Sequence, residues 1–268
     1  MRVLLAGATG AIGRQAVPVL ATAGHQVIGL ARTPIQLPDA EVVAVDALDR
    51  AAVAHAVESA HPEVIVHMLT AIPDLVDPRH LARDMALTNQ LRTHATANLL
   101  AAADGARVIA QGVAYAYDPA GSPVKDEDAP LWRDPPAQFG PEVAALVEQE
   151  RRVSWAGGLV LRLGHLYGPG SSFAPQGGFG RQLRAGRVPL VGDGASMFSF
   201  IHAHDVATAI LAAVEHPTAA GVVNIVDDQP TWSMTGCRRW RPWSAAPLPA
   251  MSRPCWRGWS SAAGVWPT

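Results

Sequence analysis

Short apolar runs alternate with longer alanine-rich segments along most of the chain. Each run has four or five mainly aliphatic residues, which is typical of strands buried on both faces of a parallel sheet. The runs lie at residues 3–6, 26–30, 41–45, 64–68, 107–110, 159–163 and 222–226. Segments such as 51–60 and 87–103 carry helical patterns between them. This alternation predicts an α/β fold with a doubly wound parallel sheet, a Rossmann fold, whose ligands bind beyond the carboxyl ends of the strands.

The same pattern predicts a domain organisation. We expect a dinucleotide-binding domain over residues 1–165, to which 195–226 return, and a small carboxyl-terminal substrate lobe from 166–194 and 227–268. After Gln229 the chain holds six of its eight tryptophans, five arginines, no acidic residue and no sustained period. We expect this tail to be aberrant or disordered, and a one-base frame slip in the gene is one explanation.

The first strand runs directly into the segment 7–13, Gly-Ala-Thr-Gly-Ala-Ile-Gly. The first glycine allows a tight turn, the second lets the backbone approach phosphate, and the third lets the next helix lie close to the strand. The helix amides then point at the anion. This predicts a site for the diphosphate of a dinucleotide, although an ordinary glycine-rich turn is the alternative. The expected contacts are Gly7, Thr9, Gly10, Ala11, Ile12 and Gly13.

The end of the second strand bears on which nicotinamide nucleotide is bound. An acidic residue there accepts hydrogen bonds from a ribose diol, whereas an arginine pairs with a 2′-phosphate. The chain has Arg32 at this place and no acid nearby, which favours NADP over NAD. The alternative is that Arg32 is simply solvated.

Charge and composition indicate which classes of binding partner and which cellular compartment to expect. The formal net charge is −2, and no basic run lies beside aromatic residues in the first 230 positions, so we expect no nucleic-acid partner. No apolar run is long enough to span a bilayer, and there is no secretion signal. The two cysteines, Cys237 and Cys255, form no disulfide framework. These features predict a cytoplasmic protein with no nucleic-acid or membrane partner.

Over about residues 1–230 the chain resembles the NAD-dependent epimerase/dehydratase family, the extended branch of the short-chain dehydrogenase/reductase superfamily. The likeness rests on the glycine turn, on Asp46 and Asn89, and on the segments 161–170, 191–194 and 200–207. The resemblance implies hydride transfer between a nicotinamide and a carbinol or carbonyl carbon. It also implies cofactor contacts from Asp46, Ala47, Leu69, Thr70 and Asn89, and a possible homodimer.

The chain departs from this family at the catalytic set. The family's Tyr-x-x-x-Lys pair falls on Phe139 and Val143, and its Ser or Thr position, within 111–114, holds no hydroxyl. No shift of register restores the pair, because Lys125 is the sole lysine and Gly121 lies four places before it. A positioned general acid or base contributes about a hundredfold to ten-thousandfold in rate, so ordinary reductase chemistry would be slow here.

Other groups near the strand ends are candidates for the missing chemistry. Tyr115, Tyr117 and His165 follow the fifth and sixth strands, on the ligand side of the sheet, and we take them as catalytic candidates. Their alternative role is structural packing. His202 and His204 lack a third ligand nearby, so we expect no metal site.

Two functions remain open from the sequence. One is an NAD(P)-binding oxidoreductase or epimerase-like enzyme of atypical mechanism, acting on a small polar substrate such as a nucleotide sugar or a secondary metabolite. The other is a catalytically silent NADP-binding sensor or regulatory protein.

Overall fold

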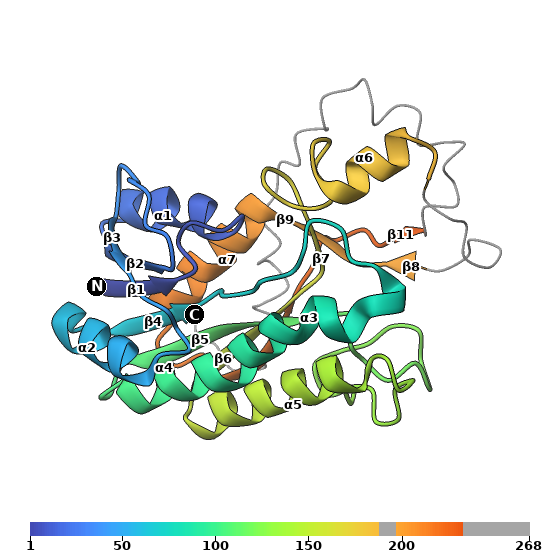
Figure 1. Ribbon diagram of the computed structural model, residues 1–268. Helices are drawn as coiled ribbons and strands as arrows, with labels where there is room; N and C mark the ends of the chain where they lie inside the picture. The colour runs from blue at the N-terminus through green and yellow to red at the C-terminus, as the bar shows by residue number, and fades with distance from the viewer. Residues whose placement is uncertain (188–196, 233–268) are drawn as a thin grey trace.

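The computed structural model describes residues 1–187 and 197–232. A seven-stranded parallel sheet forms its centre, in the order β10-β6-β5-β4-β1-β2-β3 (Figure 1). The strands are β1 (Arg2–Ala6), β2 (Gln26–Ala31), β3 (Glu41–Ala44), β4 (Val64–His67), β5 (Arg107–Val113), β6 (Leu159–Leu163) and β10 (Gly221–Ile225). This sheet confirms the predicted doubly wound α/β fold. From β1 the chain continues to β2 and β3 on one side, and from β4 it continues to β5 and β6 on the other. The gap between β1 and β4 is therefore the switch point where such sheets bind ligands.

Helices cover both faces of the sheet. Helices α1 (Gly13–Thr22) and α7 (Ala203–Glu215) pack together on one face, and α2 (Arg50–Ala60), α4 (Thr96–Ala102) and α5 (Gly140–Trp155) lie on the other (Figure 1). Strand β1 supplies both cores, because Val3 and Leu5 face the first pair while Leu4 and Ala6 face the second group. All four residues are fully buried, as alternation along a central parallel strand requires.

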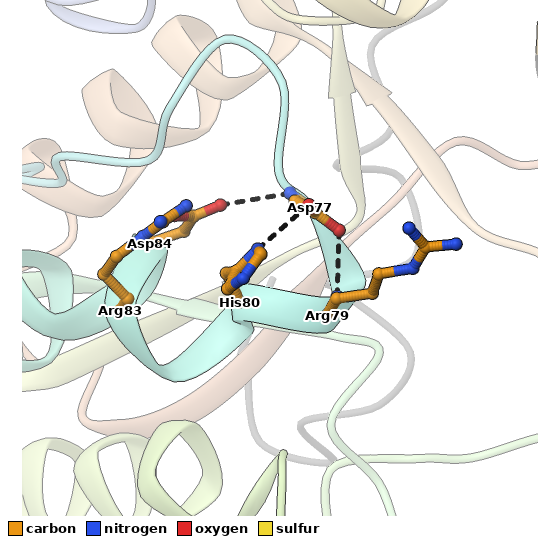
Figure 2. Close-up of polar contacts among 5 residues, drawn as sticks. All are labelled: Asp77, Arg79, His80, Arg83 and Asp84. Carbon is orange, nitrogen blue, oxygen red and sulfur yellow. Dashed lines mark hydrogen bonds and ion pairs between the residues drawn. The ribbon is translucent and has the colours of Figure 1, made fainter.

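The helical segment predicted at 87–103 begins earlier and is not uniform. Helix α3 (Leu81–Gln90) continues through a π-helical turn, η2 (Leu91–Ala95), into α4. The short 3₁₀ turn η1 (Pro78–His80) precedes it, and Figure 2 shows how Asp77 fixes this start. The Asp77 carboxylate accepts from the Arg79 amide at 2.9 Å and contacts His80 Nδ1 at 3.0 Å, while Asp84 accepts from the Asp77 amide at 3.1 Å. These bonds cap η1, which leads directly into α3, and α3 begins six residues before the predicted position without a side-chain cap of its own.

Smaller elements lie beyond the carboxyl ends of the sheet. Strand β7 (His165–Tyr167) pairs in parallel with β9 (Phe200–His202), and β8 (Met197–Phe198) pairs with β11 (Thr231–Trp232). Helix α6 (Gly178–Arg184) lies on the same side of the molecule (Figure 1). The aberrant or disordered tail expected from the sequence lies, from residue 233 onward, outside the described residues. In the described part, no helix combines the length and the apolar character that a membrane span requires.

Candidate functional site

A cavity of about 350 Å³ follows the carboxyl ends of the parallel strands. Residues that directly follow β1, β2, β3 and β4 line it, together with the ends of β5 and β6. Among the expected cofactor contacts, eleven lie in this lining: Gly7, Thr9, Gly10, Ala11, Ile12, Gly13, Arg32, Asp46, Ala47, Leu69 and Thr70. The fold therefore brings most of the sequence-selected residues into one trough.

The glycine turn fits a diphosphate because no side chain fills it. Gly7 has a φ of +96°, which disfavours any residue with a Cβ. A Cβ on Gly13 would lie 2.2 Å from the Gly7 carbonyl oxygen, so only glycine lets α1 begin this close to β1. Backbone bonds from Gly10 to Gly7 and from Arg14 to Gly10, both 3.0 Å long, hold the turn. No backbone hydrogen bond within the described residues uses the amides of Ala11 and Ile12, directly before α1, so these amides remain available to an anion.

The trough has a distinct end over β2 and β3. Arg32 is exposed there, and no hydrogen bond or ion pair within the described residues engages its side chain. Asp46 accepts from the Leu48 amide at 3.0 Å, which orients its carboxylate at the cavity wall. Arg14, which follows the turn, donates instead to the Thr9 carbonyl at 2.9 Å. Arg32 is thus the arginine at this end that is free to meet a phosphate.

At the other end, over β4, β5 and β6, the three catalytic candidates separate. Tyr115 lines the cavity, and its ring stacks on His165 with centroids 4.1 Å apart and planes 8° apart. Tyr117 does not line the cavity: its hydroxyl donates to Asn224 at 2.6 Å and accepts from Arg162 at 2.9 Å. These contacts give Tyr117 a structural setting.

Aromatic rings surround His165. Phe198 and Phe200 lie 5.1 Å and 5.5 Å from it, and Phe173 lies 5.9 Å away. Burial among these rings lowers the pKa of His165 to about 4. The imidazole is therefore neutral near pH 7 and holds no proton to give as an imidazolium.

The positions of the family's catalytic set contain no replacement of the same kind. Phe139 lies at the start of α5 and stacks on Trp132 at 6.0 Å, and Val143 is buried in the first turns of the helix. Gln111, Gly112 and Val113 line the cavity without a hydroxyl group. Desolvation raises the pKa of the Tyr115 phenol above its usual value against the charge of Arg92, and the Tyr115 residue is 52% exposed.

One expected cofactor contact, Asn89, differs from the sequence prediction. Asn89 is not in the cavity lining, and its side-chain oxygen is buried without a hydrogen-bond partner in the described chain. His202 accepts from the His204 amide at 3.2 Å and so caps α7. Within residues 1–187 and 197–232, no group of three His, Cys, Asp or Glu side chains is placed to hold a metal ion.

Among the lining residues that the sequence reasoning did not select, Arg92 is the charged one. It lies in the π-helical turn η2, is 5% exposed, and lines the cavity beside Leu91. The available signal was an arginine directly beside the apolar stripe Leu87, Leu91, Ala95 and Leu99 of the predicted helix. The π-helical turn changes the direction in which side chains leave the helix. With this change, the Arg92 side chain lies at the cavity.

Comparison with known proteins places this geometry in a family. A Streptomyces protein named 3-diazoavenalumate denitrifying reductase is 44% identical, over 97% of this chain and 88% of its own length. The 2'-dehydrokanamycin reductase of Streptomyces kanamyceticus is 28% identical, over 83% of this chain and 60% of its own length.

Solved structures share the fold. The Bordetella bronchiseptica enzyme WbmH, in complex with NAD+, superposes with a TM-score of 0.71 at 21% identity, covering 94% of this chain and 83% of its own. The Thermus thermophilus UDP-glucose 4-epimerase, in complex with NAD, gives a TM-score of 0.68 at 22% identity, covering 87% and 79%. The family model described as the NAD dependent epimerase/dehydratase family matches residues 3–226. With the glycine turn, the sheet order and this match together, the chain belongs to the NAD-dependent epimerase/dehydratase family.

Proposed function

We propose that this protein is an NADPH-dependent reductase that removes the diazo group of an aromatic compound as dinitrogen. The observation that carries the proposal is a cavity with an intact diphosphate turn at one end and no Ser, Tyr and Lys proton-transfer set at the other. The name of the relative that is 44% identical supports the same reaction class.

The chain's own residues would hold the cofactor along the trough. The turn at 7–13 would bind the diphosphate through backbone amides, because glycines leave those amides accessible. Arg32 would bind the 2′-phosphate, and Asp46 and Ala47 would lie at the adenosine end. Leu69, Thr70 and the ends of β5 and β6 would enclose the nicotinamide, which supplies a hydride when it is bound in its reduced form.

The missing acid fits the chemistry of a diazo substrate. A carbonyl needs a proton on its oxygen as it accepts hydride, whereas an aryl diazonium group is already cationic. It takes up the hydride, expels dinitrogen and leaves a carbon–hydrogen bond, so that ArN₂⁺ and H⁻ balance ArH and N₂. No protein group has to supply a proton. The loss of the Ser, Tyr and Lys set would then be compatible with turnover.

The aromatic end of the site supports a flat substrate. Tyr115, which lines the cavity, stacks on His165, and Phe173, Phe198 and Phe200 contact the His165 ring. Planar rings favour stacking on such surfaces, and each pair contributes about 0.5–1.5 kcal/mol beyond burial. The neutral His165 adds no positive charge that would repel a diazonium group.

The test uses the full-length protein with NADPH and 2-diazoniophenolate. We expect NADPH oxidation with equal amounts of phenol and dinitrogen, and deuterium from one face of 4-deuterated NADPH on the ring carbon of the phenol. Aldehydes, ketones and UDP-glucose serve as comparison substrates and should react far more slowly. Tight NADPH binding without consumption of any of these compounds would contradict the proposal and favour a nucleotide-binding sensor.

A further inference from the structure

We propose that the guanidinium group of Arg92 binds an anionic oxygen of the substrate, an oxide on the same aromatic ring that carries the diazo group. This inference rests on the proposed function for the identity of the ring. The location of the site does not depend on that function, because η2 places the buried Arg92 side chain at the substrate end of the cavity.

Arg92 is buried but unpaired in the described part of the chain. It is 5% exposed, yet no hydrogen bond and no ion pair within 4.0 Å joins its guanidinium to another described residue. A guanidinium has five N–H donors, and none of the Arg92 nitrogens is among the fully buried polar atoms that lack a partner. Because Arg92 lines the cavity, its donors open into that cavity, where an anionic ligand oxygen can take the place of water as the acceptor.

Three titratable groups act on Arg92 at a distance, namely Glu142, Tyr115 and His67, and none of them neutralises it by contact. Glu142 in the first turn of α5 and the Tyr115 phenol both favour the charged form of Arg92, against desolvation, which lowers its pKa. Both Glu142 carboxylate oxygens are buried and lack hydrogen-bond partners in the described chain. The N–H groups of the guanidinium are therefore free to bind a group in the cavity. Glu142 balances part of the positive charge without contacting it.

The place of Arg92 favours a substrate group over the cofactor's phosphates. The diphosphate turn follows β1 and Arg32 follows β2, whereas Arg92 lines the cavity together with Gln111, Val113 and Tyr115 at the β5 side. The sole lysine, Lys125, is engaged with the Ala120 carbonyl at 2.5 Å and does not line the cavity. Arg92 is thus the cation at the reacting end among the described lining residues.

An oxide bound by Arg92 explains how hydride acceptance is favoured without an acid. In a diazo compound of this kind the ring oxygen donates electrons toward the diazo group and makes it a poorer electrophile. A guanidinium on the oxygen holds the negative charge there and leaves positive charge on the diazo nitrogens. A bare diazonium cation, by contrast, would be repelled by the same guanidinium.

The first experiment measures binding without turnover, with 4-nitrophenol as the probe. Its ionised form absorbs visible light, so the absorbance of the complex with the NADP⁺-loaded protein reports the phenol pKa. We expect this pKa to fall on binding. The Arg92→Gln variant should bind the ionised probe about tenfold to a hundredfold more weakly, as loss of a charge-assisted hydrogen bond implies. Arg92→Lys should recover part of the affinity, and neutral 4-nitroanisole should bind all forms equally.

The controls separate this role from a structural one. NADPH affinity should remain unchanged in Arg92→Gln, and the double variant with Glu142→Gln removes the carboxylate that the single change leaves unbalanced. Equal affinity of wild type and both variants for ionised 4-nitrophenol would overturn the inference. A parallel loss of NADPH affinity would overturn it as well, because Arg92 would then contact the cofactor.

Turnover distinguishes this inference from the proposed function. With 2-diazoniophenolate, Arg92→Gln should lower kcat/KM by about tenfold to a hundredfold, while kcat/KM for benzenediazonium, which has no oxide and is repelled by the guanidinium, should rise. Equal losses on both compounds would contradict the role of Arg92. If the wild type reduces neither compound but binds 4-nitrophenol through Arg92, the anion site holds and the diazo reaction fails.

Discussion

At the scale of single residues, the chemistry of the site depends on which groups are absent as much as on which are present. Phe139 and Val143 hold the places of the family's proton-transfer pair, and the neutral His165 does not replace it. Tyr115 has the one phenol in the cavity lining of the described chain, and its pKa is raised. Arg32 and Arg92 supply positive charge at opposite ends of the trough.

The role of Tyr115 gives one prediction. If no protein acid is needed, Tyr115→Phe should lower kcat for 2-diazoniophenolate by less than about threefold, since the stacking ring is kept. A general acid would instead cost about a hundredfold or more. Steady-state kinetics at neutral pH measure this, with NADPH affinity as the control for folding. A loss of the larger size would assign proton transfer to Tyr115.

Arg32 gives a prediction about cofactor choice. Arg32→Ala should weaken NADPH binding about tenfold and leave NADH binding almost unchanged, because only NADPH carries the 2′-phosphate. Fluorescence titration with both nucleotides measures the two affinities. Arg14→Ala is a matched control, since Arg14 is tied to Thr9 and should not change the ratio. Equal weakening of both nucleotides would show that Arg32 does not select NADP.

At the scale of elements, β4 is fixed to the neighbouring helix by a buried histidine. His67 is fully buried at the end of the strand, with Nε2 3.1 Å from the Thr96 hydroxyl, and Nδ1 accepts from the Leu69 amide at 3.3 Å. Since Nδ1 is an acceptor, the proton of the neutral ring is on Nε2 and points to Thr96. This contact orients the segment after β4, whose Leu69 and Thr70 line the cavity.

His67 makes stability depend on pH. Burial lowers its pKa from 6.5 to about 4, so the unfolded chain binds a proton more readily than the native one. Its contribution is complete above pH 6.5 and is lost as pH falls toward 4, a change of about 3 kcal/mol in unfolding free energy. Asp227, whose pKa burial raises to about 6, offsets part of this loss.

Urea unfolding at several pH values tests the effect of His67. His67→Gln keeps a neutral polar side chain, so its stability should fall less steeply than that of the wild type between pH 6.5 and 4. The comparison uses the change in unfolding free energy with pH. A loss of stability that is the same at every pH in the variant does not alter this slope. Identical slopes would mean that His67 does not titrate in this way.

At the scale of the whole molecule, one aspartate joins the sheet domain to the elements around α6. Asp74, in the segment after β4, accepts from the Gly178 amide at 2.7 Å and from Arg181 at 2.6 Å, and its carbonyl accepts from the Ser172 hydroxyl at 2.7 Å. The Gly178 amide and then Arg181 lower the pKa of the Asp74 carboxyl. The same segment contributes Thr70 and Ile72 to the cavity.

This junction predicts a change in substrate affinity alone. Asp74→Ala should raise KM for 2-diazoniophenolate several-fold, because the segment 70–77 loses its contacts with α6, while NADPH affinity should hold. Asp134→Ala is the control, since Asp134 is exposed and lies outside the cavity lining and outside α6. An unchanged KM in Asp74→Ala would show that the junction does not shape the substrate end.

The sequence by itself determined the parallel sheet and the diphosphate turn. Both follow from local rules: apolar runs of strand length with helical segments between them, and glycines at spacings that only a tight turn requires. The family followed from the glycine turn, from Asp46 and Asn89, and from the segments 161–170, 191–194 and 200–207, and the match over residues 3–226 confirms it.

Only the tertiary structure decided which side chains meet at the substrate end. Tyr115 and Tyr117 look alike in sequence, yet Tyr117 is held by Arg162 and Asn224, 45 and 107 residues away, while Tyr115 faces the cavity. Arg92 reaches the cavity through a π turn that no periodicity predicts. The physical reason is that local propensity sets the period of an element, whereas contacts between distant segments set where each side chain points.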